Sequence, residues 1–69
     1  MNREPVQSSN VVSVGYDALG EILEIEFKGG AVYQYKQVPL HMYEQLKASE
    51  SVGSFIAGQI KPNYNCVRM

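Results

Sequence analysis

The sequence has few of the residues that cross-link small domains or bind metals in them. Its 69 residues include one cysteine, Cys66, and one histidine, His41. A single cysteine excludes an intramolecular disulfide, and the two residues together fall short of the four ligands of a structural zinc site. Because a chain of this length buries only about 60% of its unfolded surface, its stability depends on an efficient core or on a partner subunit.

An excess of charge of one sign and long apolar runs are also missing. Six Lys and Arg against seven Asp and Glu leave a net charge of −1, which excludes a strong field for capturing nucleic acid at long range. The apolar runs are too short to span a membrane, and residues 1–10 lack the apolar stretch of a secretory signal. We therefore expect a cytoplasmic protein. Its apolar content of 45% is typical of a globular domain.

The pattern along the chain predicts one domain with three strands at its start. Residues 1–9 are polar and aperiodic, so we expect a flexible N-terminal arm ahead of a single domain over residues 10–69. Residues 11–16 are mostly β-branched or aromatic and predict a first strand. Residues 21–27 alternate apolar side chains with Glu24 and Glu26, as in a half-buried strand, and residues 31–38 predict a third strand.

Helical spacing follows these strands. Pro39 suits the first turn of a helix, and Leu40, Tyr43 and Leu46 then recur on one helical face. A second short apolar face, over residues 52–60, ends before Pro62. We predict an α+β fold in which a three-stranded antiparallel β-meander is followed by two short α-helices, with residues 64–67 available for a short C-terminal strand.

The loop between the second and third strands decides which sheet face carries Tyr33 and Tyr35. A two-residue loop, Gly29-Gly30, would place both rings beside the glutamates on the solvated face. A three-residue loop from Lys28 to Gly30 would pair Ile25 with Tyr33 and place both rings beneath the helices. We favour the three-residue loop because it makes the whole sheet amphipathic and puts Gly30 at a left-handed bulge position.

Several segments in a fixed order resemble one known family. They are Ser8-x-Asn10-x-x-Ser13-x-Gly15-Tyr16, Leu23-x-Ile25-x-Phe27-x-x-Gly30-x-x-Tyr33-x-Tyr35-x-x-Val38-Pro39, Ala48-x-x-Ser51-x-Gly53-x-Phe55 and Ile60-Lys61-x-x-Tyr64. Over residues 8–65 the chain resembles the KTSC domain, which is named for the C-terminal extension of some lysyl-tRNA synthetases and also occurs as single-domain bacterial and phage proteins. Through the synthetase context, the resemblance implies RNA as a ligand.

Two groups of residues are candidates for ligand contacts. Tyr33 and Tyr35 can stack on bases, which is worth about 1–3 kcal/mol per base and needs little positive charge. Ser51 and Ser54 stand where the second helix begins, and with Lys61 after that helix they can form a phosphate site. The alternative for Ser51 is ordinary N-capping of the helix.

Catalytic and metal-binding interpretations have weaker support, so we expect neither an enzyme nor a metal or cofactor. His41 lacks a Ser or Cys at a spacing that would bring it close, and a surface imidazole explains it. Glu24 and Glu26 could bind a hard cation, but a solvated strand face explains them as well. We expect Cys66 to be a small buried hydrophobe rather than a reactive thiol.

Two function hypotheses remain. The first is a non-catalytic binding module for RNA or a nucleotide, with Tyr33, Tyr35, Ser51, Ser54 and Lys61 as its contacts. The second is a homo-oligomeric interaction or assembly module, because so small a domain gains stability by burying apolar surface against another copy. Its candidate surfaces are an open edge of the meander and the helix face around Met42. A phage-type protein that sequesters a nucleotide between subunits would combine the two.

Overall fold

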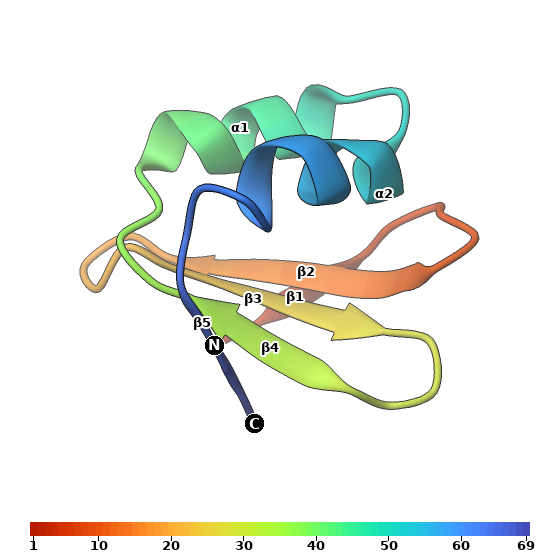
Figure 1. Cartoon of the computed structure of the whole chain (residues 1–69), viewed down its shortest axis with the longest axis horizontal. Coiled ribbons are helices and arrows are strands. Elements are labelled where there is room, and N and C mark those ends of the chain that lie inside the picture. The colour runs from red at the N-terminus through yellow and green to blue at the C-terminus, as the bar shows by residue number, and fades with distance from the viewer.

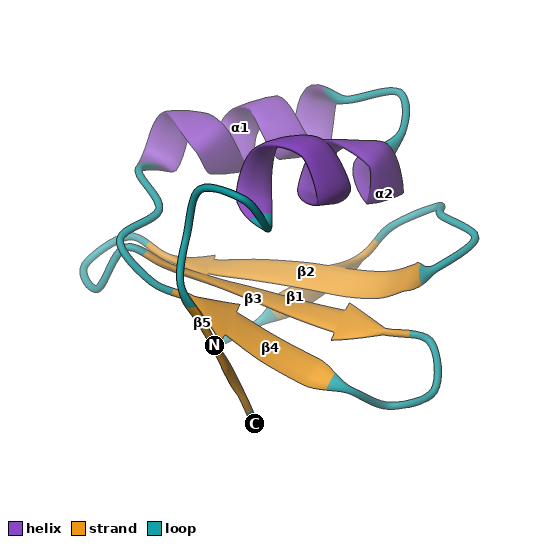
Figure 2. Ribbon diagram, viewed as in Figure 1, coloured by secondary structure: helices purple, strands orange, loops and turns teal.

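The computed structural model describes residues 1–69 as one antiparallel sheet with helices on a single face (Figure 1, Figure 2). The strands follow chain order across the sheet: β1 (Arg3–Pro5), β2 (Val11–Asp17), β3 (Ile22–Phe27), β4 (Val32–Tyr35) and β5 (Cys66–Arg68). The α+β class is confirmed, but the sheet has five strands where the sequence predicted three. None of the helices has the length and apolar character needed to cross a membrane.

The central strands form as their alternation predicts. In β3, Leu23 and Ile25 are fully buried beneath the helices. Tyr16 and Val14 of β2 stand opposite them and share their face. A bulge at Val12 lets both Val11 and Val14 face the core, whereas residues three positions apart in a regular strand face opposite sides.

The β3–β4 hairpin has the three-residue loop. Ile25 is opposite Tyr33, and the Phe27 N–H donates to the Ala31 carbonyl at 2.8 Å. Gly29 and Gly30 have φ of 98° and 96°, a region that glycine reaches without steric cost. Tyr33 therefore lies on the helix-covered face, as the amphipathic register predicted.

Part of the segment predicted as a flexible arm is an edge strand. Arg3–Pro5 pairs with β2, with Arg3 opposite Gly15. The close approach requires a glycine, because a Cβ on Gly15 would lie 2.7 Å from the Asn2 carbonyl oxygen. Arg3 also reaches across the open sheet face, its Nη1 lying 2.6 Å from an oxygen of Glu24. The polar sequence of this segment does not predict a strand. Its strand conformation depends on pairing with β2, which is distant in the chain.

At the other edge, β5 pairs with β4 and provides the predicted C-terminal strand, two residues later than its expected start. Tyr35 is opposite Cys66, and Tyr33 is opposite Arg68. The two edges of the predicted meander are thus covered by β1 and β5.

The helices differ from the prediction at one end. α1 (Leu40–Ala48) begins after Pro39, and α2 (Val52–Phe55) continues directly into a π-helical turn, η1 (Ile56–Ile60). The Lys61 N–H donates to the Ile56 carbonyl, five residues back, at 2.8 Å. The spacing of apolar residues predicts where a helix lies but not this wider turn. Such π-helical turns often occur at functional sites.

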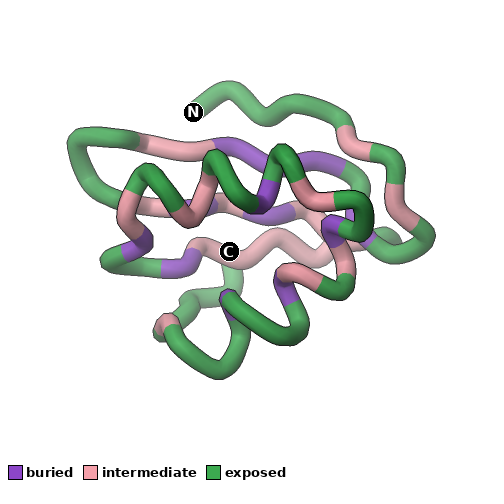
Figure 3. Tube along the Cα trace, turned by 90° about the horizontal axis from the view of Figure 1, so that it is seen from above, coloured by how far each residue is buried: buried purple, intermediate pink, exposed green.

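The core lies between the sheet and the helices. Its fully buried side chains come from every layer (Figure 3), and the largest are Leu23, Ile25, Leu46, Ile56 and Ile60. At one end of the core, the Tyr16 ring stacks on Tyr43 with centroids 5.0 Å apart. The Tyr16 hydroxyl donates to the Val38 carbonyl at 2.5 Å and so fixes the connection from the sheet to α1.

Candidate ligand-binding pocket

A pocket opens where the β3–β4 hairpin, β5 and the end of η1 meet. Its volume is about 520 Å³, within the range of small-molecule sites. Its lining residues come from five parts of the chain: Asn10, Phe27, Ala31, Tyr33, Tyr35, Lys61 and Cys66. It therefore brings together three of the five ligand contacts predicted from the sequence, namely Tyr33, Tyr35 and Lys61.

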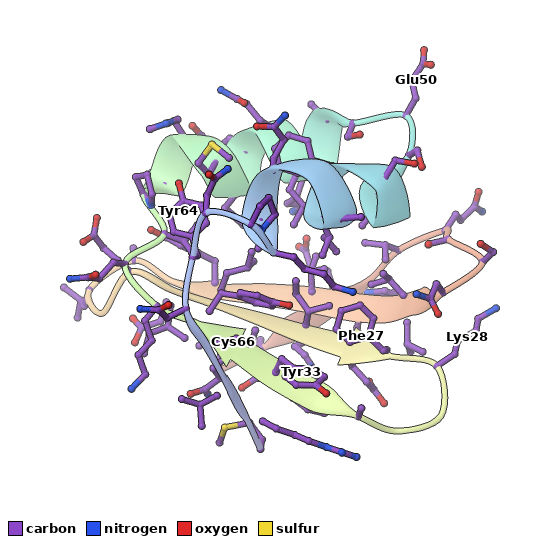
Figure 4. All side chains as sticks on the ribbon, viewed as in Figure 1. Phe27, Lys28, Tyr33, Glu50, Tyr64 and Cys66 are labelled. Carbon is purple, nitrogen blue, oxygen red and sulfur yellow. The ribbon has the colours of Figure 1, made fainter.

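Two aromatic rings form one wall of the pocket. Phe27 and Tyr33 meet edge to face, with centroids 5.7 Å apart and planes inclined by 75°. Both side chains are only half-buried, so part of each ring faces solvent. Figure 4 shows them on neighbouring strands, with Cys66 on the far side of Tyr33 from Phe27. This wall offers an apolar, polarisable surface to a flat ligand.

The cation of the pocket comes from the end of the helix. Lys61 directly follows η1, and its Nζ lies 5.3 Å from the centroid of the Phe27 ring. Lys61 is exposed and forms no ion pair. The ammonium group is thus held at the aromatic wall by a cation–π contact while it remains free to meet an anion.

Tyr35 forms the floor of the pocket. It is only 3% exposed, so it cannot stack on a base as predicted. Burial, followed by the Cys66 thiol and Tyr33, raises the pKa of Tyr35 to about 12. Its hydroxyl is therefore protonated at neutral pH and can donate a hydrogen bond into the pocket.

Cys66 is exposed, and the prediction that it is buried is wrong. Its place in β5 explains the difference, because β5 is an edge strand with only one neighbouring strand and no helix above it. Cys66 stands beside the apolar Val67 in the sequence, which does not show that its strand lies at the edge of the sheet.

The two serines lie at the other end of the helix from Lys61. Ser51 Oγ accepts a hydrogen bond from the Ser54 N–H at 3.3 Å and donates one to Ser54 Oγ at 3.0 Å. Ser51 is thus an N-cap of α2, whereas Lys61 follows the end of the same continuous helix. The structure does not bring Ser51 and Ser54 together with Lys61, so the phosphate site predicted from these three residues is not assembled.

The other polar candidates are engaged elsewhere or isolated. On the open sheet face, Glu24 also accepts from Gln34 at 2.8 Å, and Glu26 accepts from the Ser13 hydroxyl at 3.1 Å. His41 is exposed on α1 and does not line the pocket. Nowhere do three His, Cys, Asp or Glu side chains gather closely enough to hold a metal ion.

Four lining residues were missed from the sequence: Asn10, Phe27, Ala31 and Cys66. Phe27 could have been found, because the favoured register places it on the same face as Tyr33, two residue pairs along the hairpin. Asn10 and Cys66 were not, since each reaches the pocket through a distant pairing. The Asn10 carbonyl, for example, accepts from the Lys28 N–H at 2.9 Å.

Comparison with known proteins gives a consistent result. Residues 7–64 match the family model described as the KTSC domain. A protein of Tsukamurella paurometabola is 41% identical over 66 residues, which are 96% of this chain and 98% of the relative. An uncharacterized protein of Stutzerimonas stutzeri is 39% identical over 64 residues, covering 93% and 90% of the two chains.

A solved structure agrees with the sequence relatives. The crystal structure of a KTSC domain protein from Yersinia pestis is similar to this one with a TM-score of 0.93 at 38% identity. The similarity covers 99% of this chain and 96% of the other. The match to the family model, the sequence relatives and the shared fold together show that the chain belongs to the KTSC domain family.

Proposed function

We propose that this domain is a non-catalytic binding module whose pocket takes a nucleotide, either free or as an unpaired residue of RNA. One observation carries the proposal. The Lys61 ammonium lies 5.3 Å above the Phe27 ring, in the same pocket as Tyr33. An aromatic wall next to an unpaired cation matches a ligand that is planar at one end and anionic at the other.

Each part of the pocket supports such a ligand. A base that stacks on an aromatic side chain gains about 1–3 kcal/mol, whatever its identity. The Tyr35 hydroxyl can donate to a carbonyl or ring nitrogen on the base edge. No carboxylate lines the pocket, so nothing there repels a phosphate.

The composition of the pocket favours binding over catalysis. Its one strong nucleophile is Cys66, and the only histidine, His41, is not among the lining residues. A thiol without a neighbouring base is a poor catalytic nucleophile. Nucleotides and RNA are abundant in the cytoplasm, which we propose as the compartment of this protein.

The test is a titration followed by two-dimensional amide NMR, with the four nucleoside 5′-monophosphates as separate ligands. We expect the amides of Phe27, Ala31 and Tyr33 to shift in a saturable way with at least one of them. Lys61→Gln should weaken this binding several-fold. The matched control is Lys36→Gln, because Lys36 is also exposed and unpaired but does not line the pocket. Unmoved pocket amides at millimolar concentrations of all four nucleotides would refute the proposal.

Self-association is the second candidate function, and the outer edge of β5 favours it. All residues of Cys66–Arg68 are exposed, and no strand lies beyond them. Val67 is 47% exposed, so a second copy pairing there would cover apolar surface as well as free backbone groups. Met42, the other predicted contact, is half-buried against the core. Sedimentation equilibrium distinguishes the 7.7 kDa monomer from a dimer, and a monomer at high micromolar concentration would exclude this candidate.

A further inference from the structure

The cations of this nearly neutral protein are unevenly distributed. Arg3 pairs with Glu24 and Glu26, and Lys47 pairs with Glu4. The remaining four basic side chains form no ion pair: Lys28, Lys36, Lys61 and Arg68. Three of these four belong to the elements around the pocket, and only Lys36 is assigned to the open sheet face by strand alternation.

Arg68 has the most informative position of the three. It stands directly opposite Tyr33 in the β4–β5 pairing, and opposite residues of an antiparallel pair share a face. Its neighbour on that face, Cys66, lines the pocket. Arg68 therefore lies on the pocket side of β5, next to the aromatic wall, and is exposed.

No carboxylate lines the pocket. Glu24 and Glu26 project from the opposite face, where Arg3 neutralises them. Figure 4 shows Glu50 beyond α2, well away from Tyr33 and Cys66. Unpaired cations beside a stacking surface that no carboxylate lines are the arrangement with which proteins follow a single strand.

We propose that the ligand is a single strand of two or more nucleotides, with one base in the pocket, one phosphate at Lys61 and a second phosphate at Arg68. This inference rests on the proposed function and goes beyond it, because a mononucleotide fills the pocket and needs only Lys61. Lys61 follows η1 and Arg68 lies on β5, so the strand would cross the pocket mouth from the helix end toward the sheet edge.

Salt dependence measures the number of phosphates directly. The logarithm of affinity for a single strand falls with the logarithm of salt concentration by about 0.7 per neutralised phosphate. The probes are the four hexanucleotide homopolymers of RNA and the four corresponding nucleoside monophosphates. For the hexanucleotide that binds most tightly, we expect this slope of affinity against salt to be about −1.4 for the wild-type domain and about −0.7 for Arg68→Gln.

The controls separate this inference from the proposed function. Arg68→Gln should weaken the hexanucleotide about threefold or more at low salt and leave the mononucleotide within about twofold. Lys36→Gln should change neither slope nor affinity. An unchanged slope in Arg68→Gln, or equal losses for both ligands, would overturn the second phosphate contact while the pocket proposal stands. Absence of binding by every nucleotide and hexanucleotide would overturn both.

Discussion

The Lys61 ammonium lies over the Phe27 ring at one wall of the pocket, 5.3 Å from the ring centroid. This contact joins the end of the helical layer to the end of β3, two segments far apart in the chain. It orders the cation without neutralising it, because an aromatic face attracts a cation but carries no net charge. Both the shape and the charge of the pocket therefore depend on this pair.

The Lys61–Phe27 contact should make a measurable contribution to stability. Lys61→Met keeps the apolar stem but removes the charge, so we expect a loss of about 0.5–1 kcal/mol in the free energy of unfolding. Phe27→Leu also loses the edge-to-face contact with Tyr33, for a total of about 1–3 kcal/mol. Urea unfolding measures both changes. Lys61→Met should be introduced both into the wild-type protein and into Phe27→Leu. If it leaves the free energy of unfolding unchanged in both, the contact is energetically neutral.

Because of Tyr35, we expect the free energy of unfolding to decrease at alkaline pH. The pKa of Tyr35 is about 12 in the folded protein, whereas the pKa of a tyrosine in an unfolded chain is about 10. Below pH of about 10 both states hold the proton, and stability does not depend on this group. Between about 10 and 12 the unfolded state releases the proton first, so the folded state loses stability as pH rises.

Comparison with Tyr35→Phe isolates the contribution of the Tyr35 hydroxyl, because the two proteins share every other titratable group. We expect the free energy of unfolding to fall more steeply with pH in the wild-type protein than in Tyr35→Phe above pH of about 10. Parallel pH profiles in urea unfolding would mean that the Tyr35 hydroxyl is as free to ionise in the folded domain as in the unfolded chain.

Two glycines provide a matched pair of alanine substitutions. At Gly15 a Cβ would lie 2.7 Å from the Asn2 carbonyl oxygen, so Gly15→Ala should displace β1 and lower the melting temperature. At Gly58, inside η1, a Cβ meets nothing within 4 Å. Gly58→Ala should therefore be neutral or stabilising by up to about 1 kcal/mol. Calorimetry of the two variants compares them, and equal melting temperatures would contradict the tight packing of β1 on Gly15.

Ser51 should be important for stability and not for ligand binding. Ser51→Ala removes the hydroxyl that caps the Ser54 N–H, at a cost of about 0.5–2 kcal/mol. Nucleotide affinity should stay within about twofold, because Ser51 and the pocket lie at opposite ends of the helix. If Ser51→Ala is stable but binds nucleotides much more weakly, the phosphate would bind at the start of α2 rather than at Lys61.

Much of the fold was accessible from local pattern. The alternation of Leu23, Ile25 and Phe27 predicted β3, and the requirement for one apolar sheet face favoured the three-residue hairpin loop that the structure has. These features depend on side chains close together in the chain, where periodicity and turn chemistry act directly.

The rest of the fold depends on distant partners. β1 is a polar segment containing Pro5, and it is a strand only because Gly15 leaves space for it. The pocket joins residues from Asn10 to Cys66, so its aromatic residues could be found in the sequence while its shape could not. The wide turn of η1 ends with a hydrogen bond from the Lys61 N–H to the Ile56 carbonyl, which no spacing of apolar residues predicts.

The most direct test of the proposed function is the position of a bound nucleotide, measured by intermolecular nuclear Overhauser effects in the saturated complex. We expect contacts from the base and ribose protons to the ring protons of Phe27 and Tyr33 and to the Ala31 methyl group. Contacts confined to the residues around Ser51, or to the open sheet face around Glu24, would contradict it.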